Sequence, residues 1–154
     1  MPAPDGHPLL RLDRLSKRFG DRLAVEALTL EVAPGEIYGL IGPNGSGKTT
    51  TVKMITGLYR PTAGQVLIAG IDLRAEPERA KGLLGYIPDE PFVYEKMTGR
   101  EFLGLVAALY RVAEPERTRR IEELLDLYHL GPDADAYVDT YSRGNRQKLA
   151  LVAA

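Results

Sequence analysis

Residues 42–49 have the sequence Gly-Pro-Asn-Gly-Ser-Gly-Lys-Thr, which matches the pattern G-x-x-x-x-G-K-[ST]. The run before it, residues 37–41, is continuously apolar, as expected for a strand covered on both faces in a parallel sheet. Apolar residues after it recur at helical spacing over residues 48–58. The order of strand, glycine-rich loop and helix is the context that this motif requires. The sequence therefore predicts a phosphate-binding loop of the P-loop class, and the alternative is a glycine-rich turn that only ends a strand.

The residue types of this loop suit the binding of a nucleotide. Glycines let the backbone curl so that successive N–H groups face phosphate oxygens, and the N-terminus of the following helix adds its positive end. We expect Lys48 to neutralise the β- and γ-phosphates and the Thr49 hydroxyl to ligate Mg²⁺. The expected nucleotide-binding residues are Gly42, Asn44, Gly45, Ser46, Gly47, Lys48, Thr49 and Thr50.

The composition is that of an ordinary globular domain and excludes several functions. Of 154 residues, 44% are hydrophobic and 27% are charged, which suffices for one domain core. The formal net charge of −1 provides no electrostatic attraction to nucleic acid or anionic lipid, so no nucleic-acid partner is expected. The absence of cysteine excludes disulfides, thiolate zinc sites and cysteine nucleophiles.

Two further features bear on the membrane and on export. The Pro-rich start carries Asp5 and His7 where a signal peptide would need a basic end and then an apolar stretch, so export is not expected. The most apolar helical stretch, residues 103–110, is far shorter than the roughly 20 residues of a membrane helix. Any membrane role must therefore run through a partner. We assign no role to either histidine, and we expect His7 and His129 at the surface.

The first half of the chain is expected to form a sheet. Residues 10–15 and 28–32 alternate between apolar and polar side chains, which predicts an antiparallel β unit. Residues 65–69 and 85–87 are predicted as further strands, and residues 76–81 as a short helix between them.

The second half is expected to be helical, with no linker that would separate it as an independent domain. Thr98 and Glu101 form a capping box at the start of the first helix. Pro115 is expected at the first helical position of the second helix, which Gly131-Pro132 ends. The predicted apolar stripes are Phe102, Leu105, Val106, Leu109 and Tyr110 in the first helix, and Ile121, Leu124, Leu125 and Tyr128 in the second.

The sequence around the loop carries a resemblance that runs nearly end to end. Pro34-Gly35-Glu36 precedes the predicted strand, and Gly57-Leu58 and Pro61-Thr62-Ala63-Gly64 follow the predicted helix. Together with the loop, these segments resemble the sequences of ABC transporter ATPase domains. The resemblance implies an α/β fold, with an incomplete P-loop NTPase (RecA-like) core, an N-terminal antiparallel β unit and a helical subdomain. The implied division of this partial domain, 1–154, is 1–88 for the β unit and P-loop core, 89–141 for a Q-loop-like segment and the helical subdomain, and 142–154 for the start of the signature helix.

Two single positions gain a role from the resemblance. Phe19 stands where the family places an aromatic ring against adenine, although a core phenylalanine is the alternative. Asp89 stands where the family's Q-loop usually has glutamine. A carboxylate can reach the metal or an ordered water, which makes Asp89 a candidate metal ligand and catalytic residue. It also adds negative charge beside the γ-phosphate and cannot donate a hydrogen bond as an amide can. Residues 90–101 continue in the style of two-component ABC-2 exporters, and a solvated loop is the alternative for any one of them.

Residues 141–148, Tyr-Ser-Arg-Gly-Asn-Arg-Gln-Lys, are similar to the ABC signature sequence. Ser142 and Gly144 are in place, whereas Tyr141, Arg143 and Asn145 replace the commoner Leu, Gly and Gln. A helix N-terminus capped by a hydroxyl suits an anion presented from outside. In the family that anion is the γ-phosphate of the facing subunit, so Ser142 and Gly144 are expected to contact nucleotide in trans. The alternative is an ordinary serine N-cap.

The family's remaining catalytic residues lie beyond the signature helix. P-loop ATPases complete the Mg²⁺ site with an Asp at the end of a second apolar strand. ABC ATPases add a catalytic Glu and a later His, and the sequence ends at Ala154 within the signature helix. Asp72 follows a run interrupted by Gly70, and Asp126 lies in a helical segment, so neither substitutes. We therefore expect the chain to be a fragment that does not hydrolyse ATP and is poorly folded by itself.

The leading hypothesis that the resemblance implies is the ATP-binding subunit of an ABC exporter, with ATP and Mg²⁺ as cofactors. It implies transmembrane permease subunits and a second ATPase domain in a head-to-tail dimer as partners, on the cytoplasmic face of the cell membrane. One alternative is a nucleotide-binding module that never turns over. Another is a soluble ABC ATPase of DNA repair or translation, which the near-neutral charge, the lack of a long heptad insertion and the exporter-like text of residues 86–103 argue against.

Overall fold

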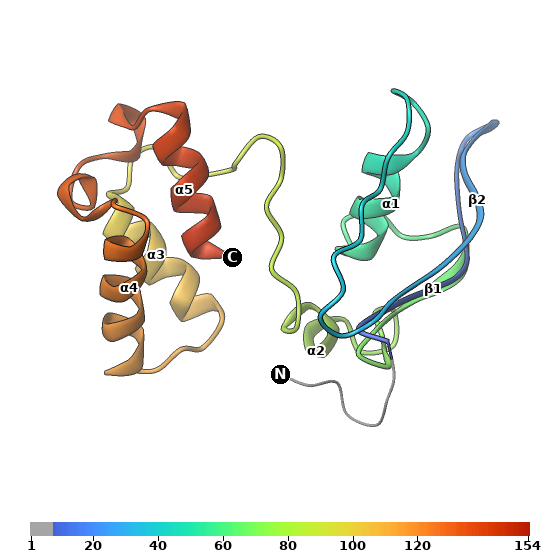
Figure 1. Cartoon of the computed structure of the whole chain (residues 1–154), viewed down its shortest axis with the longest axis horizontal. Coiled ribbons are helices and arrows are strands. Elements are labelled where there is room, and N and C mark those ends of the chain that lie inside the picture. The colour runs from blue at the N-terminus through green and yellow to red at the C-terminus, as the bar shows by residue number, and fades with distance from the viewer. Residues whose placement is uncertain (1–7) are drawn as a thin grey trace. The chain divides into compact units, whose positions relative to one another are not determined.

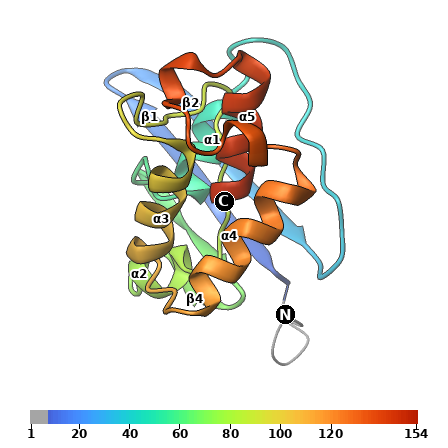
Figure 2. The ribbon, with the colours of Figure 1, turned by 90° about the vertical axis from the view of Figure 1, so that its left-hand side faces the viewer.

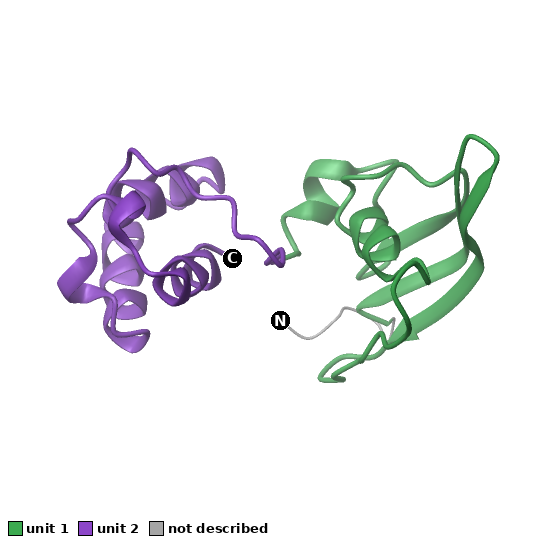
Figure 3. Cartoon of the chain, turned by 90° about the horizontal axis from the view of Figure 1, so that it is seen from above, with its two compact units in different colours: residues 1–84 green, residues 85–154 purple. Residues whose placement is uncertain are grey.

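The computed structural model describes residues 8–154, so the Pro-rich start and His7 lie outside the described residues. The chain divides into two compact units, which meet in sequence between Leu84 and Gly85 (Figure 3). Each unit has its own hydrophobic core. The signature-like segment belongs to the second unit, together with the helices that precede it.

The first unit is built on a four-stranded antiparallel sheet with the order β2-β1-β3-β4. Figure 1 labels β1 and β2, which lie side by side. The strands are β1 (Leu10–Phe19), β2 (Arg22–Val32), β3 (Ala63–Ile68) and β4 (Ile71–Asp72). Gly20, with φ of 52°, allows the tight turn between β1 and β2. The predicted antiparallel unit is confirmed, with both strands longer than the alternation indicated. The strand predicted at residues 65–69 is also confirmed, shifted toward the N-terminus.

Two helices join this sheet in the first unit, α1 (Lys48–Ile55) and α2 (Pro77–Lys81). Both were predicted, but α1 ends earlier than residue 58. The chain leaves the helix at Gly57, where φ is 72°, so Leu58 falls outside it and is exposed. The face of α1 toward the sheet therefore carries Thr51 and Met54. The core of the unit consists of Leu12, Leu15, Val25, Met54, Val66, Ile68, Leu73 and Ala80.

Residues 37–41 and 85–87 are not strands, so these two predictions are wrong. Instead, the side chains of Ile37 and Ile41 are 99% and 94% exposed. A strand forms only where a neighbour supplies the other half of its hydrogen-bond ladder. Within residues 8–154 the four strands pair only with one another, and every pair is antiparallel. The apolar run has the composition of a parallel strand without a partner among the described residues.

The second unit is a helical bundle in which α3 packs against both α4 and α5 (Figure 2). Its helices are α3 (Gly99–Leu109), α4 (Glu116–Leu127) and α5 (Arg143–Ala153), with the 3₁₀ turns η2 (Gly131–Asp133) and η3 (Val138–Thr140). The predicted capping box is present, because the Glu101 N–H donates to Thr98 Oγ1 at 3.1 Å and the Thr98 N–H to Glu101 Oε2 at 2.8 Å. The core consists of Phe102, Leu103, Leu125, Leu130, Ala134, Val138, Tyr141 and Leu149.

The apolar stripe predicted for α4 is confirmed, but that of α3 is only partly right. Phe102 and Val106 pack into the core, whereas Leu109 and Tyr110 are 72% and 59% exposed. Because α3 meets two helices, its buried arc includes Leu103, which the single stripe left out.

The ends of α4 differ slightly from the prediction. Pro115 caps the helix instead of occupying its first helical position. His129, which follows the helix, is exposed as predicted. The helix itself therefore lies where its apolar spacing placed it.

We predict that Gly64→Ala destabilises the chain far more than Gly70→Ala, which is a matched control. Both glycines have φ of 80°, so each alanine carries a left-handed backbone penalty of about 1–2 kcal/mol. A Cβ at Gly64 would also overlap the carbonyl oxygens of Asp13 and Arg14, whereas a Cβ at Gly70 meets nothing within 4 Å. The overlap should add roughly 1–3 kcal/mol, as overpacking does. Urea denaturation measures both, and equal losses would show that β3 does not approach β1 this closely.

Candidate nucleotide-binding site

Residues 42–49 form the loop that leads into α1, and glycine is required where the loop meets the sheet. Gly45 and Gly47 have φ of 84° and 90°, in the left-handed region. A Cβ at Gly47 would lie 2.5 Å from the carbonyl oxygen of Ala24 and 3.0 Å from a methyl group of Val25, both in β2. The loop therefore lies directly on the backbone of β2, and any side chain at Gly47 would push it away.

The start of α1 presents unused backbone donors. The Thr51 N–H makes the first helical bond, to Gly47 O at 2.8 Å, and the Ser46 N–H donates to Pro43 O at 3.3 Å. Within the described part of the chain, the other N–H groups from Gly45 to Thr50 donate no hydrogen bond. Together with the positive end of the helix, these donors suit the oxygens of a phosphate chain.

The side chains of the loop add a cation and a hydroxyl. Lys48 Nζ donates to the carbonyl oxygens of Gly42 and Pro43, at 2.6 and 2.7 Å, which holds the ammonium group over the loop. Thr49 is exposed in the first turn of α1, whereas Thr51 is buried and anchors that turn. The position of the Lys48 ammonium group suits it to phosphate oxygens that enter the loop.

The donor set also fits Mg²⁺ in the manner expected of a nucleotide site. In residues 8–154 no group of three or more His, Cys, Asp or Glu side chains could hold a metal ion. The exposed Thr49 hydroxyl is a hard oxygen ligand, and Mg²⁺ in phosphate sites usually keeps several waters and takes one or two protein ligands. Thr49 fits as such a ligand, and the ion would supply neutralisation of the phosphate charge.

Phe19 lies at the end of β1, 43% exposed, with its ring edge-to-face against Tyr59 at a centroid distance of 5.4 Å. Lys17 Nζ lies 5.0 Å from the centroid of the Phe19 ring. The hairpin pairs Phe19 with Arg22, whose guanidinium lies 3.9 Å from the Cβ position of Gly45. The sequence did not predict that Arg22 lies beside the loop. The signal that could have indicated it is the Gly20-Asp21 turn between two predicted strands, because such a turn pairs Phe19 with Arg22.

The remaining predicted site residues, Asp89, Ser142 and Gly144, belong to the second unit. Asp89 is exposed, and its side chain makes no hydrogen bond within the residues described. Ser142 caps α5, since its Oγ accepts from the Asn145 N–H at 3.1 Å. Gly144 follows in the first turn, where a Cβ would approach only Ser142 Oγ, at 3.8 Å. The predicted residues thus form two sets, one in each unit.

Two of the departures from the signature pattern hold the N-terminus of α5 in place. The Tyr141 hydroxyl donates to Asp133 O at 2.6 Å, and Asn145 Nδ2 donates to Asp133 Oδ2 at 2.8 Å. Burial raises the pKa of Tyr141. Tyr141 and Asn145 therefore both fasten α5 to the η2 turn.

A second set of contacts ties the segment before α3 to α5. Arg146 pairs with Glu95 Oε1 at 3.1 Å and donates from Nη2 to Asp139 O at 2.9 Å. Lys96 reaches Asp139 Oδ2 at 2.9 Å, and this hydrogen bond raises the pKa of Lys96. Arg146 Nε is buried without a hydrogen-bond partner among the described residues. These contacts join the segment before α3 and the η3 turn to the first turn of α5.

The fold and the loop define a nucleotide-binding domain of the P-loop class, and comparison with known proteins places it more narrowly. The family model for ABC transporters matches residues 25–154. The chain belongs to the ABC transporter family. Members of this family bind ATP with Mg²⁺, which agrees with the donors and the hydroxyl of the loop.

Similar proteins include subunits named for export and for drug resistance. The lipopolysaccharide export system ATP-binding protein LptB of Acidithiobacillus ferridurans is 37% identical over 148 residues, which cover 95% of this chain and 61% of the relative. The daunorubicin resistance ATP-binding protein DrrA2 of Streptomyces coeruleorubidus is 34% identical, over 97% of this chain and 46% of the relative. The chain thus spans about half to three fifths of the length of these two relatives.

Solved structures give the same fold. An ATP-binding subunit of an ABC transporter superposes with a TM-score of 0.88 at 37% identity, covering 95% of this chain and 61% of that chain. CbiO1 of Clostridium perfringens superposes with a TM-score of 0.81 at 18% identity, which shows the shared fold alone. Among the described residues, no helix has the length and the apolar composition needed to cross a membrane.

We predict that Lys48→Ala weakens ATP binding tenfold or more, which corresponds to about 1.4 kcal/mol. The reason is that the loop loses the ammonium group held over Gly42 and Pro43. Lys53→Ala is the matched control, because Lys53 lies on the same helix but its ammonium group is directed at the Tyr59 ring, 5.2 Å from the centroid. Calorimetric titration with Mg-ATP measures both, and an unchanged affinity in Lys48→Ala would contradict the assignment of the loop.

Proposed function

We propose that this chain is the nucleotide-binding part of an ABC exporter subunit that couples ATP binding and hydrolysis to transport. The observation that carries the proposal is the loop 42–49, with its free N–H groups and the Lys48 ammonium group at the start of α1. The names of the relatives LptB and DrrA2, which refer to export and drug resistance, support the exporter assignment. The substrate is not encoded here, because such systems select it through their membrane subunits.

In this proposal the first unit holds one ATP. Phe19 presents an exposed ring to the adenine base, and residues 42–50 bind the phosphates, with Arg22 beside Gly45 as an additional cation. Thr49 ligates Mg²⁺. One face of Phe19 is already approached by Lys17, so the base would use the remaining exposed face.

The second unit contributes to the nucleotide of a second copy in a head-to-tail dimer. Ser142 uses its oxygen as an acceptor for the Asn145 N–H, which leaves its O–H free to donate to a phosphate oxygen. Gly144 lets that phosphate approach the backbone, since nothing but Ser142 Oγ stands near its Cβ position. Asp89 is proposed to act on the metal or on the attacking water.

The proposed partners are transmembrane permease subunits, and the proposed location is the cytoplasmic face of the cell membrane. Because no described helix could cross a bilayer, this chain would reach the membrane through those subunits. Nucleic acid is not a proposed partner, since a net charge of −1 provides no cationic surface excess. Co-expression with a polytopic membrane protein encoded next to this gene tests the assignment. Association that survives detergent extraction supports it, and recovery of the chain with DNA or ribosomes instead would contradict it.

A nucleotide-binding module without turnover is the second candidate function. The observation in its favour is that residues 42–50 include no carboxylate, so the loop binds phosphates without any group that activates water. Asp89 and Glu90 are carboxylates of the second unit, and neither makes a hydrogen bond to another described residue that would orient it.

We predict that the purified 154-residue chain binds Mg-ATP but does not turn it over. Phosphoryl transfer depends on positioning and on charge stabilisation, so a site without an oriented carboxylate loses most of the rate. Release of inorganic phosphate at saturating ATP measures turnover, with Lys48→Ala as the blank. Sustained release above that blank would contradict the prediction, and loss of the rate in Asp89→Asn would then identify the carboxylate responsible.

A further inference from the structure

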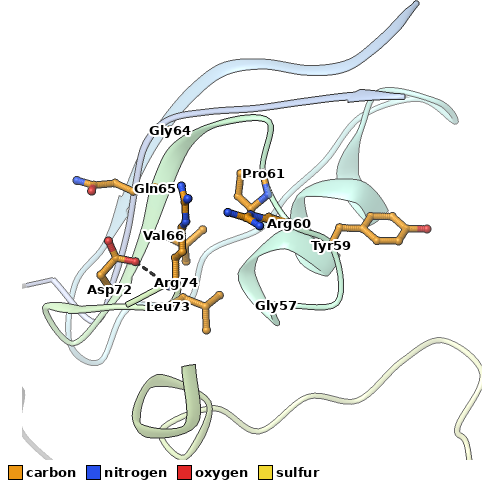
Figure 4. A pocket seen from close by; sticks show the side chains of 10 residues that line it. All are labelled: Gly57, Tyr59, Arg60, Pro61, Gly64, Gln65, Val66, Asp72, Leu73 and Arg74. Carbon is orange, nitrogen blue, oxygen red and sulfur yellow. Dashed lines mark hydrogen bonds between the residues drawn. The ribbon is translucent and has the colours of Figure 1, made fainter. Parts of the chain in front are cut away.

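A pocket of about 490 Å³ lies in the first unit, and none of its lining residues belongs to the phosphate-binding loop (Figure 4). Its walls come from the chain after α1, from β3 and from the turn after β4. The eight residues of α1, about 12 Å of helix, separate the loop at one end from the pocket at the other. Volumes of this size are typical of sites for small molecules. This pocket is therefore distinct from the ATP site.

Two arginine side chains enter this pocket from different walls. Figure 4 shows the guanidinium groups of Arg60 and Arg74 pointing into the space between the chain after α1 and β4. Among residues 8–154, neither guanidinium forms an ion pair or donates a hydrogen bond. Two unpaired like charges that face one cavity repel each other, and an anion between them would remove that repulsion.

The one carboxylate in the wall, that of Asp72, forms no ion pair with either guanidinium group, and one of its oxygens accepts from the backbone instead. Asp72 Oδ1 accepts from the N–H of Arg74 at 2.7 Å and of Ala75 at 3.3 Å. A third cation stands at the edge, since the Lys81 side chain lies against Gly57, with Nζ 3.4 Å from the Cβ position of that glycine. The local balance is therefore three cations against one anion.

The C-terminus of α1 is the negative end of the helix dipole, but some of its last carbonyl groups already accept hydrogen bonds. Lys53 O accepts from the Tyr59 N–H at 2.8 Å, and Met54 O accepts from the Gly57 N–H at 3.1 Å. These bonds satisfy carbonyl groups that would otherwise carry the negative end of the helix dipole. Satisfying them reduces the repulsion that this helix end would exert on an anion in the pocket.

The backbones that carry both arginines are fixed before any ligand arrives. Lys17 Nζ donates to Arg60 O at 2.7 Å, which ties the chain after α1 to β1. The Leu73 N–H donates to Val66 O at 3.0 Å, and the Asp72 carboxylate holds the next N–H, that of Arg74. A ligand would therefore have to order only the side chains, which lowers the entropic cost of binding.

We propose that this pocket binds a small organic phosphate, with its phosphate group between Arg60 and Arg74. Planar guanidinium groups match phosphate oxygens in pairs, which a lysine ammonium cannot do. The apolar part of the wall, formed by Pro61, Val66 and Leu73, suits the organic body of such a molecule. The site would give this subunit a second anionic ligand beside ATP, bound at the opposite end of α1.

The test is calorimetric titration of the chain with phenyl phosphate and with inorganic phosphate, in the Lys48→Ala background that weakens the ATP site. We expect phenyl phosphate to bind more tightly than inorganic phosphate, because only the former uses the apolar wall. Arg60→Gln and Arg74→Gln should each weaken phenyl phosphate binding tenfold or more. Arg79→Gln is the matched control, since Arg79 is a nearby exposed arginine that already pairs with Glu76 at 3.0 Å, and it should change affinity less than twofold.

Two further measurements distinguish loss of the phosphate contact from unfolding of the variants, and a soluble ligand from a lipid head group. Circular dichroism checks that the variants, which alter only exposed side chains, stay folded. Sedimentation with phosphatidylcholine vesicles, with and without phosphatidate, tests for a lipid head group as the source of the phosphate. Absence of phenyl phosphate binding, equal losses in Arg79→Gln, or binding only to phosphatidate vesicles would each overturn the proposal.

Discussion

The approach of Gly47 to the backbone of β2 is the contact on which the first unit depends. Because Gly47 has no side chain, the loop rests on Ala24, and α1 starts at a fixed place above the sheet. Met54, fully buried about two turns after Gly47, fixes the other end of α1 in the core. With both ends of α1 fixed, the free N–H groups at its start point in one direction, as phosphate binding requires. The same constraint places the chain after α1 where Arg60 can enter the pocket that it shares with Arg74.

In the first unit a close backbone contact fixes the start of α1. In the second unit, hydrogen bonds and ion pairs fix the start of α5. Asp133 accepts hydrogen bonds from Tyr141 and Asn145. At both of these positions the signature-like segment departs from the common pattern. Each departure brings a donor that the family's usual leucine or glutamine would not place in the same way. These two bonds therefore hold the N-terminus of α5 against the η2 turn. Arg143, the third departure, is exposed, and no contact in the structure gives a reason for it.

The sequence predicted best those features that depend on a few neighbouring residues. The capping box at Thr98 and the β1–β2 hairpin are of this kind, because their hydrogen bonds join residues close in sequence. Residues 37–41 failed as a strand because apolar composition indicates burial but does not supply a partner strand. The site shows the same limit. The motif alone predicts the loop. The place of Arg22 beside the loop depends on the register of the hairpin, and the presence of Arg60 and Arg74 in one pocket depends on the packing of two turns that are distant in sequence.

The proposed ATP contacts are divided between two separately packed units. This division bears on how ATP binding could drive a conformational change. A ligand shifts a conformational equilibrium only by the difference in its affinity for the two states. Phosphates held by residues 42–50 contact the first unit alone, and the core of that unit contains no residue of the second, so this binding by itself favours no arrangement of the units. Contacts by Asp89, Ser142 and Gly144 would exist only in some arrangements, and these contacts would supply the difference. In the proposed exporter, the free energy that drives transport must therefore come from the contacts of the second unit, and the phosphate-binding loop holds the nucleotide where those contacts can form.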